Sequence, residues 1–141
     1  MSNLDRALEI AVYAHKGQVD KAGASYILHP LRVMMTMTSP EARIAAVLHD
    51  VVEDTEWTLK ALEDEGFSST VLEALDCLTL RPNEKYAAYV ERVGQNALAR
   101  AIKLADLKDN MDLTRIANPV PKDFERVRKY HQAWTELSAK A

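Results

Sequence analysis

The stretch AAVLHDVVEDT, Ala45 to Thr55, decides the fold, because it sets charged side chains inside an apolar run. On one helix at about 100° per residue, its aliphatic side chains group on one side. The opposite side carries His49, Asp50, Glu53 and Asp54. A solvated helix face is one interpretation. However, small apolar residues flank the polar ones, and no Lys or Arg between Arg43 and Lys60 could pair with the acids.

A second stretch, AIKLADLKDNM from Ala101 to Met111, has the same character. Lys103, Asp106 and Asn110 line up on a helix between two apolar flanks, which predicts burial on both flanks. A buried carboxylate at Asp106 needs a cation or strong donors. Lys103, one turn earlier, is one candidate for that cation, and a bound metal ion is the other.

His29 completes a possible metal site. It stands before Pro30, after the apolar residues YIL. Together with His49, Asp50 and Asp106 it gives two imidazoles and two carboxylates from three helices. Mixed nitrogen and oxygen ligands suit borderline divalent ions such as Mn²⁺, Fe²⁺ or Zn²⁺ and argue against a structural zinc site made of thiolates. Four protein ligands leave places for water and a substrate oxygen.

Helical spacing continues through the rest of the chain, and strand-like alternation is absent from the sequence. The 4 glycines and 5 prolines fall mostly at plausible breaks between helices. We expect an all-α, compact single-domain fold over residues 1–141. The expected helices cover about 3–15, a segment from 29–30 onward, 40–52 after Ser39 as N-cap, 58–64, a segment from 68 or 69, a segment ending near 94, 97–113 after Asn96 as N-cap, and 122–137.

Bulk properties limit the classes of function. With 18 basic and 21 acidic side chains, the net charge of −3 makes a duplex-DNA ligand a poor expectation. One cysteine, Cys77, allows no intrachain disulfide. The N-terminus lacks the apolar core of a secretory signal, and no apolar run approaches the ~20 residues that span a bilayer. We therefore expect a cytoplasmic protein with a small-molecule partner, neither nucleic acid nor membrane; the oligomeric state stays open.

The ordered pattern H…HD…D resembles the signature of the HD-domain metal-dependent phosphohydrolases. Three longer blocks narrow the resemblance: AHKGQVDKAGASYILHPLRV, AAVLHDVVEDT and KLADLKDNM. In this order they resemble the hydrolase domain of the RelA/SpoT-homologue enzymes. Without a second domain, the chain looks like a small alarmone hydrolase, and alarmone synthesis is not expected.

The resemblance implies a ligand set, a cofactor and a reaction. It implies Mn²⁺, with Fe²⁺, Zn²⁺ and Co²⁺ as alternatives, held by His29, His49, Asp50 and Asp106. It also implies that Glu53 and Asp54 serve the attacking water, and that Asn110 lies near the substrate ribose. Lys21 and Lys103 are expected to offset phosphate charge. The family reaction removes pyrophosphate from the 3′ position of (p)ppGpp and gives GDP or GTP.

The chain departs from the family pattern at two places. Asp20 stands where an arginine usually stacks on guanine, and a carboxylate offers no cation–π attraction. Leu107, Lys108 and Asp109 replace the usual arginine and histidine before Asn110. Two alternatives therefore stay open: an HD phosphohydrolase for another nucleotide, such as a nucleoside monophosphate or an NADPH-type phosphate, and a non-catalytic nucleotide-binding module.

Overall fold

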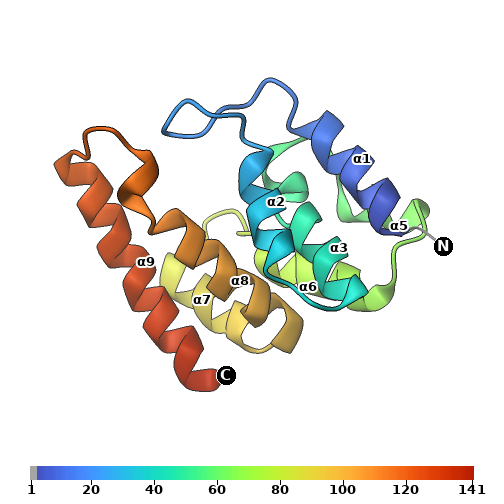
Figure 1. Ribbon diagram of the computed structural model, residues 1–141. Coiled ribbons are helices and arrows are strands. Elements are labelled where there is room, and N and C mark those ends of the chain that lie inside the picture. Colours follow the sequence, from blue (N-terminus) through green and yellow to red (C-terminus); the bar gives the residue numbers. More distant parts are fainter. Residues whose placement is uncertain (1–2) are drawn as a thin grey trace.

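Helices form nearly all of the regular structure in the computed structural model, which describes residues 3–141 (Figure 1). Over these residues the one extended pairing is an isolated bridge between Val19 and Ser25. The all-α prediction is therefore confirmed. The helices are α1 (Leu4–Ala14), α2 (Leu28–Met35), α3 (Pro40–Leu48), α4 (Val51–Asp54), α5 (Leu59–Asp64), α6 (Ser69–Leu78), α7 (Tyr86–Gly94), α8 (Ala97–Asn110), the 3₁₀ helix η1 (Leu113–Arg115) and α9 (Pro121–Lys140).

Side-chain caps set most helix starts where the sequence predicts them. Ser39 Oγ accepts a hydrogen bond from the Ala42 amide at 3.2 Å, and Asn96 Oδ1 accepts one from Ala99 at 2.8 Å. Each cap satisfies one of the amides that a first helical turn leaves without a partner. Ser68, rather than Ser69, caps α6. The predicted helix over 97–113 ends earlier, at Asn110, and η1 follows.

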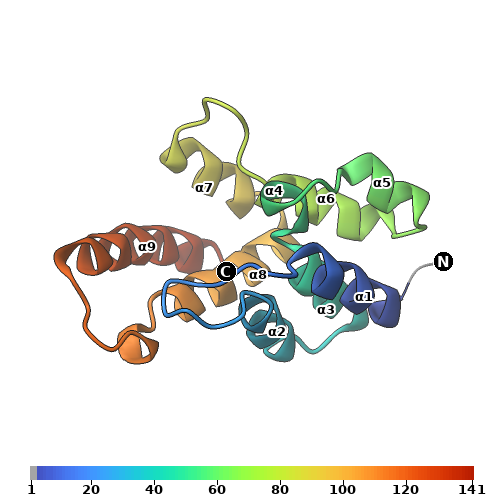
Figure 2. The same ribbon diagram turned by 90° about the horizontal axis from the view of Figure 1, so that it is seen from above.

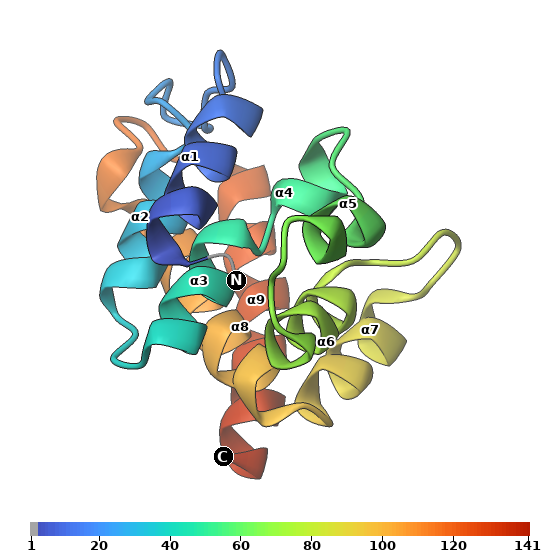
Figure 3. The ribbon, with the colours of Figure 1, turned by 90° about the vertical axis from the view of Figure 1, so that its right-hand side faces the viewer.

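Helix α3 lies at the centre of the fold and packs against α1, α2, α6 and α8 (Figure 1). Its residues Ala45 to Leu48 have no exposed surface, so the carboxyl-terminal part of this helix is buried on every side. Figure 3 shows α1 and α2 on one flank of α3 and α5 to α7 on the other. In Figure 2, α8 lies between α3 and α9. The last residues of α3 therefore lie in the interior of the fold.

The prediction of one helix through residue 52 is wrong. Helix α3 ends at Leu48, and the short α4 begins at Val51. Both the backbone and the ring of His49 close this end of the helix: its amide donates to the Ala46 carbonyl oxygen at 3.3 Å, and its ring Nδ1 lies 2.6 Å from the same oxygen. His49 and Asp50 thus form a turn, and the four polar residues do not share one continuous helix face.

One hydrophobic core joins the helices. Its largest buried members include Ile10, Leu48, Leu75, Ile102 and Leu137, which come from five different helices. Leu48 and Val51, the residues on either side of the α3–α4 turn, both belong to this core, so packing anchors both ends of the turn. None of the helices within residues 3–141 is long and apolar enough to cross a membrane.

Candidate active site

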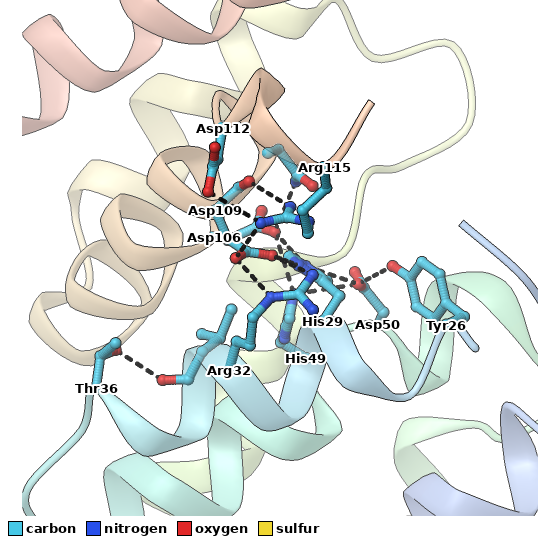
Figure 4. Close-up of polar contacts among 12 residues, drawn as sticks. Tyr26, His29, Arg32, Thr36, His49, Asp50, Asp106, Asp109, Asp112 and Arg115 are labelled. Atoms are coloured by element: carbon cyan, nitrogen blue, oxygen red, sulfur yellow. Dashed lines mark hydrogen bonds and ion pairs between the residues drawn. The ribbon is translucent and has the colours of Figure 1, made fainter. Parts of the chain in front are cut away.

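Four side chains from three parts of the chain meet beside the α3–α4 turn (Figure 4). They are His29 on α2, His49 and Asp50 in the turn, and Asp106 on α8. One ligand atom from each lies within 4.8 Å of the others. Both histidines and Asp106 are 3–4% exposed, and Asp50 is partly buried. The structure thus brings together all four residues that the sequence predicts as metal ligands.

Both imidazoles turn Nε2 toward the two carboxylates. His29 Nε2 lies 2.8 Å from Asp106 Oδ1 and 3.7 Å from Asp50 Oδ2. His49 Nε2 lies 3.1 Å from Asp50 Oδ2 and 3.4 Å from Asp106 Oδ1. The four atoms face one another across a few ångströms, as the ligands of a single ion do.

The other ring nitrogens decide the tautomers. His29 Nδ1 lies 2.6 Å from Asp109 Oδ2, and His49 Nδ1 lies 2.6 Å from the Ala46 carbonyl. Because these oxygens are acceptors, each Nδ1 carries its proton. A neutral ring then presents the Nε2 lone pair to carboxylate oxygens that also carry lone pairs. The buried Nε2 of His49 has no hydrogen-bond partner in residues 3–141. A divalent cation among these atoms would satisfy all of them, so the residues fit a metal ion.

The pKa values show how strongly this cluster attracts positive charge. Burial lowers the pKa of His49, but Asp50 and Asp106 outweigh burial and raise that pKa well above its ordinary value. For His29, burial also lowers the pKa, and Asp106 and Asp109 raise it overall. The cluster therefore takes up protons on its rings or holds a metal ion in their place.

Asp106 uses each carboxylate oxygen differently. Its Oδ2 accepts a hydrogen bond from Lys103 Nζ at 2.8 Å, and its Oδ1 accepts one from Asn110 Nδ2 at 3.0 Å while facing the histidines. A lysine partner and a metal ion, the two partners expected for this buried carboxylate, are therefore compatible. On the other side of the cluster, the Tyr26 hydroxyl donates to Asp50 Oδ2.

In the sequence, Asp109 stands out only as a departure from the family pattern. Asp109 lies behind His29 and is held by Arg32, whose Nε and Nη2 donate to the two carboxylate oxygens at 2.8 and 3.0 Å (Figure 4). Arg115 Nη2 donates to the Asp109 carbonyl oxygen at 2.9 Å. The sequence spacing could have indicated this contact, because His29 and Arg32 are one turn apart on α2 and Asp106 and Asp109 are one turn apart on α8.

The acidic pair Glu53 and Asp54 follows on α4, with both side chains exposed at the rim of the cluster. Glu53 Oε2 accepts a hydrogen bond from the Leu80 amide at 3.2 Å. Desolvation, followed by repulsion from Asp50 and Glu53, raises the pKa of Asp54 to about 6. Desolvation also raises the pKa of Glu53. Both groups can therefore exchange protons closer to neutral pH than ordinary carboxylates.

Two cavities open beside the cluster. The cavity of about 310 Å³, here the outer lobe, is lined by Val19, Asp20, Lys21, Ala22, Tyr26, Asn110, Asp112, Arg115, Ile116, Arg126 and Tyr130. The cavity of about 250 Å³, here the inner lobe, is lined by Tyr26, His49, Asp50, Glu53, Leu78, Leu80, Tyr86, Tyr89, Lys103, Asp106, Asn110, Lys129 and Tyr130. Because Tyr26, Asn110 and Tyr130 line both lobes, the lobes are neighbours.

The predicted substrate residues divide between the lobes: Lys21 lines the outer one, Lys103 the inner one, and Asn110 both. Sequence reasoning missed Arg115 and Arg126, which line the outer lobe from the far end of the chain. No local motif marks them, because only the packing of η1 and α9 brings them to the site.

Asp20 serves the conformation of the loop before α2. Its Oδ1 accepts hydrogen bonds from the amides of Ala22 and Ala24 at 2.9 and 3.0 Å. The residue in the family's arginine position therefore stabilises a turn with its carboxylate. The outer lobe obtains its positive charge from Lys21, Arg115 and Arg126 instead.

No family model matches the chain. A GTP pyrophosphokinase of Streptomyces coelicolor is 35% identical over 128 residues, which are 82% of this chain and 15% of that protein. A guanosine-3′,5′-bis(diphosphate) 3′-pyrophosphohydrolase of Haemophilus influenzae is 37% identical over 117 residues, 72% of this chain and 17% of that protein. The chain thus spans less than a fifth of the length of these relatives.

Among solved structures, a metazoan SpoT orthologue described as hydrolysing ppGpp superposes with a TM-score of 0.80. The match covers 97% of this chain and 85% of that one at 24% identity, which shows a shared fold. The sequence relatives, the shared fold and the H…HD…D cluster agree with one another. The chain therefore belongs to the RelA/SpoT-type family of HD-domain hydrolases.

Proposed function

We propose that this chain is a metal-dependent (p)ppGpp 3′-pyrophosphohydrolase that uses Mn²⁺. The observation that carries the proposal is the cluster itself: two imidazole nitrogens and two carboxylate oxygens lie within 4.8 Å of one another, beside two lobes whose walls include lysine and arginine side chains. Relatives named 3′-pyrophosphohydrolases in Haemophilus influenzae and Aquifex aeolicus support the choice of substrate. Other relatives are named pyrophosphokinases, but the acidic pair beside the cluster favours hydrolysis.

His29, His49, Asp50 and Asp106 would hold the ion. A divalent ion bound there supplies Lewis acidity, which lowers the pKa of water and offsets the negative charge of phosphoryl oxygens. Mixed imidazole and carboxylate ligands suit Mn²⁺, and Fe²⁺, Zn²⁺ and Co²⁺ are compatible with the same donor set. Asp109 and the Ala46 carbonyl accept from Nδ1 of the two rings, so that in the neutral rings the lone pair on Nε2 would be free to bind the ion.

Glu53 lines the inner lobe, where the Leu80 amide holds its carboxylate. We assign it the orientation of the attacking water and the removal of its proton. The water oxygen forms a bond to the inner 3′ phosphorus, and the bond from that phosphorus to the ribose 3′ oxygen breaks. Asp54, with its pKa raised to about 6, is suited to protonating the departing 3′ oxygen. The products are pyrophosphate and GDP or GTP.

The cations of the two lobes surround this reaction. Lys103 Nζ lies 2.8 Å from Asp106 Oδ2 and lines the inner lobe. Lys21, Arg115 and Arg126 line the outer lobe, where Asn110 would contact the ribose. Charge supplied from fixed positions stabilises a phosphate without solvent rearrangement.

The test is a substrate and metal panel. The metal-stripped protein should regain release of pyrophosphate and GDP from ppGpp when Mn²⁺ is restored, and His49→Ala and Asp106→Ala should lose both bound metal and activity. Binding of ppGpp without turnover under Mn²⁺, Fe²⁺, Zn²⁺ and Co²⁺ would favour a non-catalytic nucleotide-binding module.

A second candidate is a phosphohydrolase of the same type with another nucleotide substrate. The carboxylate of Asp20, in the position of the guanine-stacking arginine, motivates it. If the substrate is a guanosine alarmone, Asp20→Arg should lower KM for ppGpp. Turnover of a nucleoside monophosphate or NADPH that exceeds turnover of ppGpp, with no gain in Asp20→Arg, would favour the second candidate.

A further inference from the structure

We propose that the inner lobe is a diphosphate subsite, where Lys129, Lys103 and Tyr86 hold the outer phosphate of a 3′-pyrophosphate. The inference rests on the proposed function, since it names the part of the substrate that this cavity takes. It also assigns a role to Lys129 and Tyr86, two residues outside the motifs that define the cluster.

The walls of the inner lobe suit an anion next to a reacting phosphate. His49, Asp50, Asp106 and Glu53 contribute the reacting side. Two cations line the same cavity: Lys103 from α8 and Lys129 from α9. When the inner phosphate of a diphosphate lies beside the cluster, the outer phosphate lies in the same small cavity. The two ammonium groups can then bind this outer phosphate.

Tyr86 gives an independent indication of a ligand. Its hydroxyl oxygen is buried and has no hydrogen-bond partner in the part of the chain that the structure describes. A buried hydroxyl without a partner destabilises the fold, and proteins rarely keep one without a reason. An anionic oxygen in the inner lobe would accept this hydrogen bond.

Each of the two lysines lies over a tyrosine ring. Lys129 Nζ lies 4.1 Å from the centroid of the Tyr86 ring, which holds its charge at the cavity. Lys103 Nζ lies 5.2 Å from the centroid of the Tyr89 ring and donates one hydrogen bond to Asp106. An ammonium group has three donors, so Lys103 keeps capacity for a phosphate oxygen after that bond.

The sizes of the two lobes indicate which part of the substrate each lobe holds. At about 250 Å³ the inner lobe is smaller than the ~300–1,000 Å³ of typical whole-ligand pockets. The outer lobe is about 310 Å³ and carries apolar side chains, Val19, Ala22 and Ile116, suited to a nucleoside. With the nucleoside in the outer lobe, the inner lobe receives the group on the far side of the attacked phosphorus. A 3′-monophosphate would leave that subsite without an anion.

The test compares two substrates and two inorganic anions. Lys129→Ala and Tyr86→Phe should raise KM for ppGpp about tenfold and leave KM for the analogue with a single 3′-phosphate within twofold. They should also weaken inhibition by inorganic pyrophosphate about tenfold and leave inhibition by orthophosphate unchanged. Bound metal, measured by elemental analysis, should stay at the wild-type level. Arg128→Ala is the matched control, since it removes one positive charge from the same turn of α9 at an exposed position.

Calorimetry separates this inference from the proposed function. Pyrophosphate, added as its preformed Mn²⁺ complex to the Mn²⁺-loaded protein, should bind the wild type and Arg128→Ala alike and bind Lys129→Ala about tenfold more weakly. This result supports the subsite even if ppGpp is not hydrolysed. Equal pyrophosphate affinity in wild type and Lys129→Ala, or equal losses on both 3′-substituted substrates, would overturn the subsite even if ppGpp is hydrolysed.

Discussion

Arg92 and Glu53 contact opposite ends of one peptide group, the one that joins Thr79 to Leu80. Arg92 Nη2 donates to the Thr79 carbonyl oxygen at 2.9 Å, and the Leu80 amide donates to Glu53 Oε2 at 3.2 Å. Arg92 also donates to the carbonyl oxygens of Asp76 and Cys77 at 3.0 and 3.2 Å. A residue of α7 thus fixes the amide that orients a carboxylate of the site.

Substitution of Arg92 should therefore act through Glu53. In Arg92→Met we expect kcat to fall about tenfold, since loss of position at a reacting group is costly, with KM and bound metal little changed. Because the Leu80 hydrogen bond lowers the pKa of Glu53, its loss should move the acid limb of the pH profile to higher pH. Arg92→Lys should recover part of kcat. Arg81→Met serves as the control, because it removes an exposed arginine from the loop that contains Leu80. An equal fall in kcat in this variant would contradict the role of Arg92.

The buried pair Lys103 and Asp106 should determine the stability of the metal-free protein. The Lys103 side chain is 13% exposed, and Asp106 is its ion-pair partner at 2.8 Å. Asp106→Asn leaves a buried ammonium group without a carboxylate, so we expect a loss of about 3 kcal/mol in the free energy of unfolding by urea. The double variant Lys103→Met, Asp106→Leu should recover most of that loss. A double variant as unstable as Asp106→Asn would show that the ion pair is not the cause.

The ionised side chain of Asp54 should destabilise the folded protein at neutral pH. Desolvation and the neighbouring acids raise its pKa to about 6 from the ordinary 3.8, so the folded state binds a proton more tightly than the unfolded chain. The ionised group then destabilises the fold above about pH 6, and this effect disappears as the pH falls toward 4.

Asp54→Asn should consequently melt roughly 1–3 °C above the metal-free wild type at pH 7, with no advantage at pH 4. Its kcat should fall, as expected when a residue serves function at the expense of stability. Thermal melts at the two pH values check the first part. An advantage that is the same at both pH values would mean that ionisation of Asp54 is not responsible.

Sequence reasoning located the cluster because its residues are exceptional where they stand. His49 and Asp50 interrupt an apolar run, and Asp106 lies between two apolar flanks, so a reason for their burial could be sought. Helix starts were equally accessible, since Ser39 and Asn96 cap through hydrogen bonds over three residues. Both kinds of inference depend on local chemistry.

The missed features depend on tertiary contacts instead. At the helix break, the Nδ1 atom of His49 contacts the Ala46 carbonyl oxygen, while Nε2 of the same ring faces the cluster. Helical periodicity in the sequence does not indicate these contacts. Arg126 and Lys129 enter the site because α9 packs against α8, and they lie 15 and 18 residues beyond Met111, the end of the last motif. In the sequence alone, these two residues cannot be distinguished from arginines and lysines of an ordinary protein surface.

Metal binding should release protons. Asp50, Asp106 and Asp109 raise the pKa values of His49 and His29 in the metal-free protein, and a metal ion requires both Nε2 atoms unprotonated. The affinity for Mn²⁺ should therefore rise with pH until the folded-state pKa values of both rings are passed. Calorimetry in buffers of different ionisation enthalpy measures the protons released. Zero release at pH 6 would contradict the raised pKa values.

Asp109 should set metal affinity without touching the ion. It holds His29 through Nδ1 at 2.6 Å and is itself fixed by Arg32, so the imidazole has one orientation and one tautomer. Loss of such an outer partner typically weakens metal binding about 10–100-fold. We expect a loss in this range for Mn²⁺ in Asp109→Ala. Asp109→Asn should lose less, because the amide oxygen can still accept from Nδ1.

The matched control for Asp109 is Asp112→Ala, which removes the same charge three residues later from an exposed side chain. If Asp109 acted only through its charge, both alanine variants would lose similar affinity, and both losses would shrink at high salt. Orientation of His29 predicts a difference instead: only the loss in Asp109→Ala should persist in 1 M salt. Titrations of Mn²⁺ at low and high salt, followed by calorimetry, distinguish the two causes, and equal losses would rule out the orienting role.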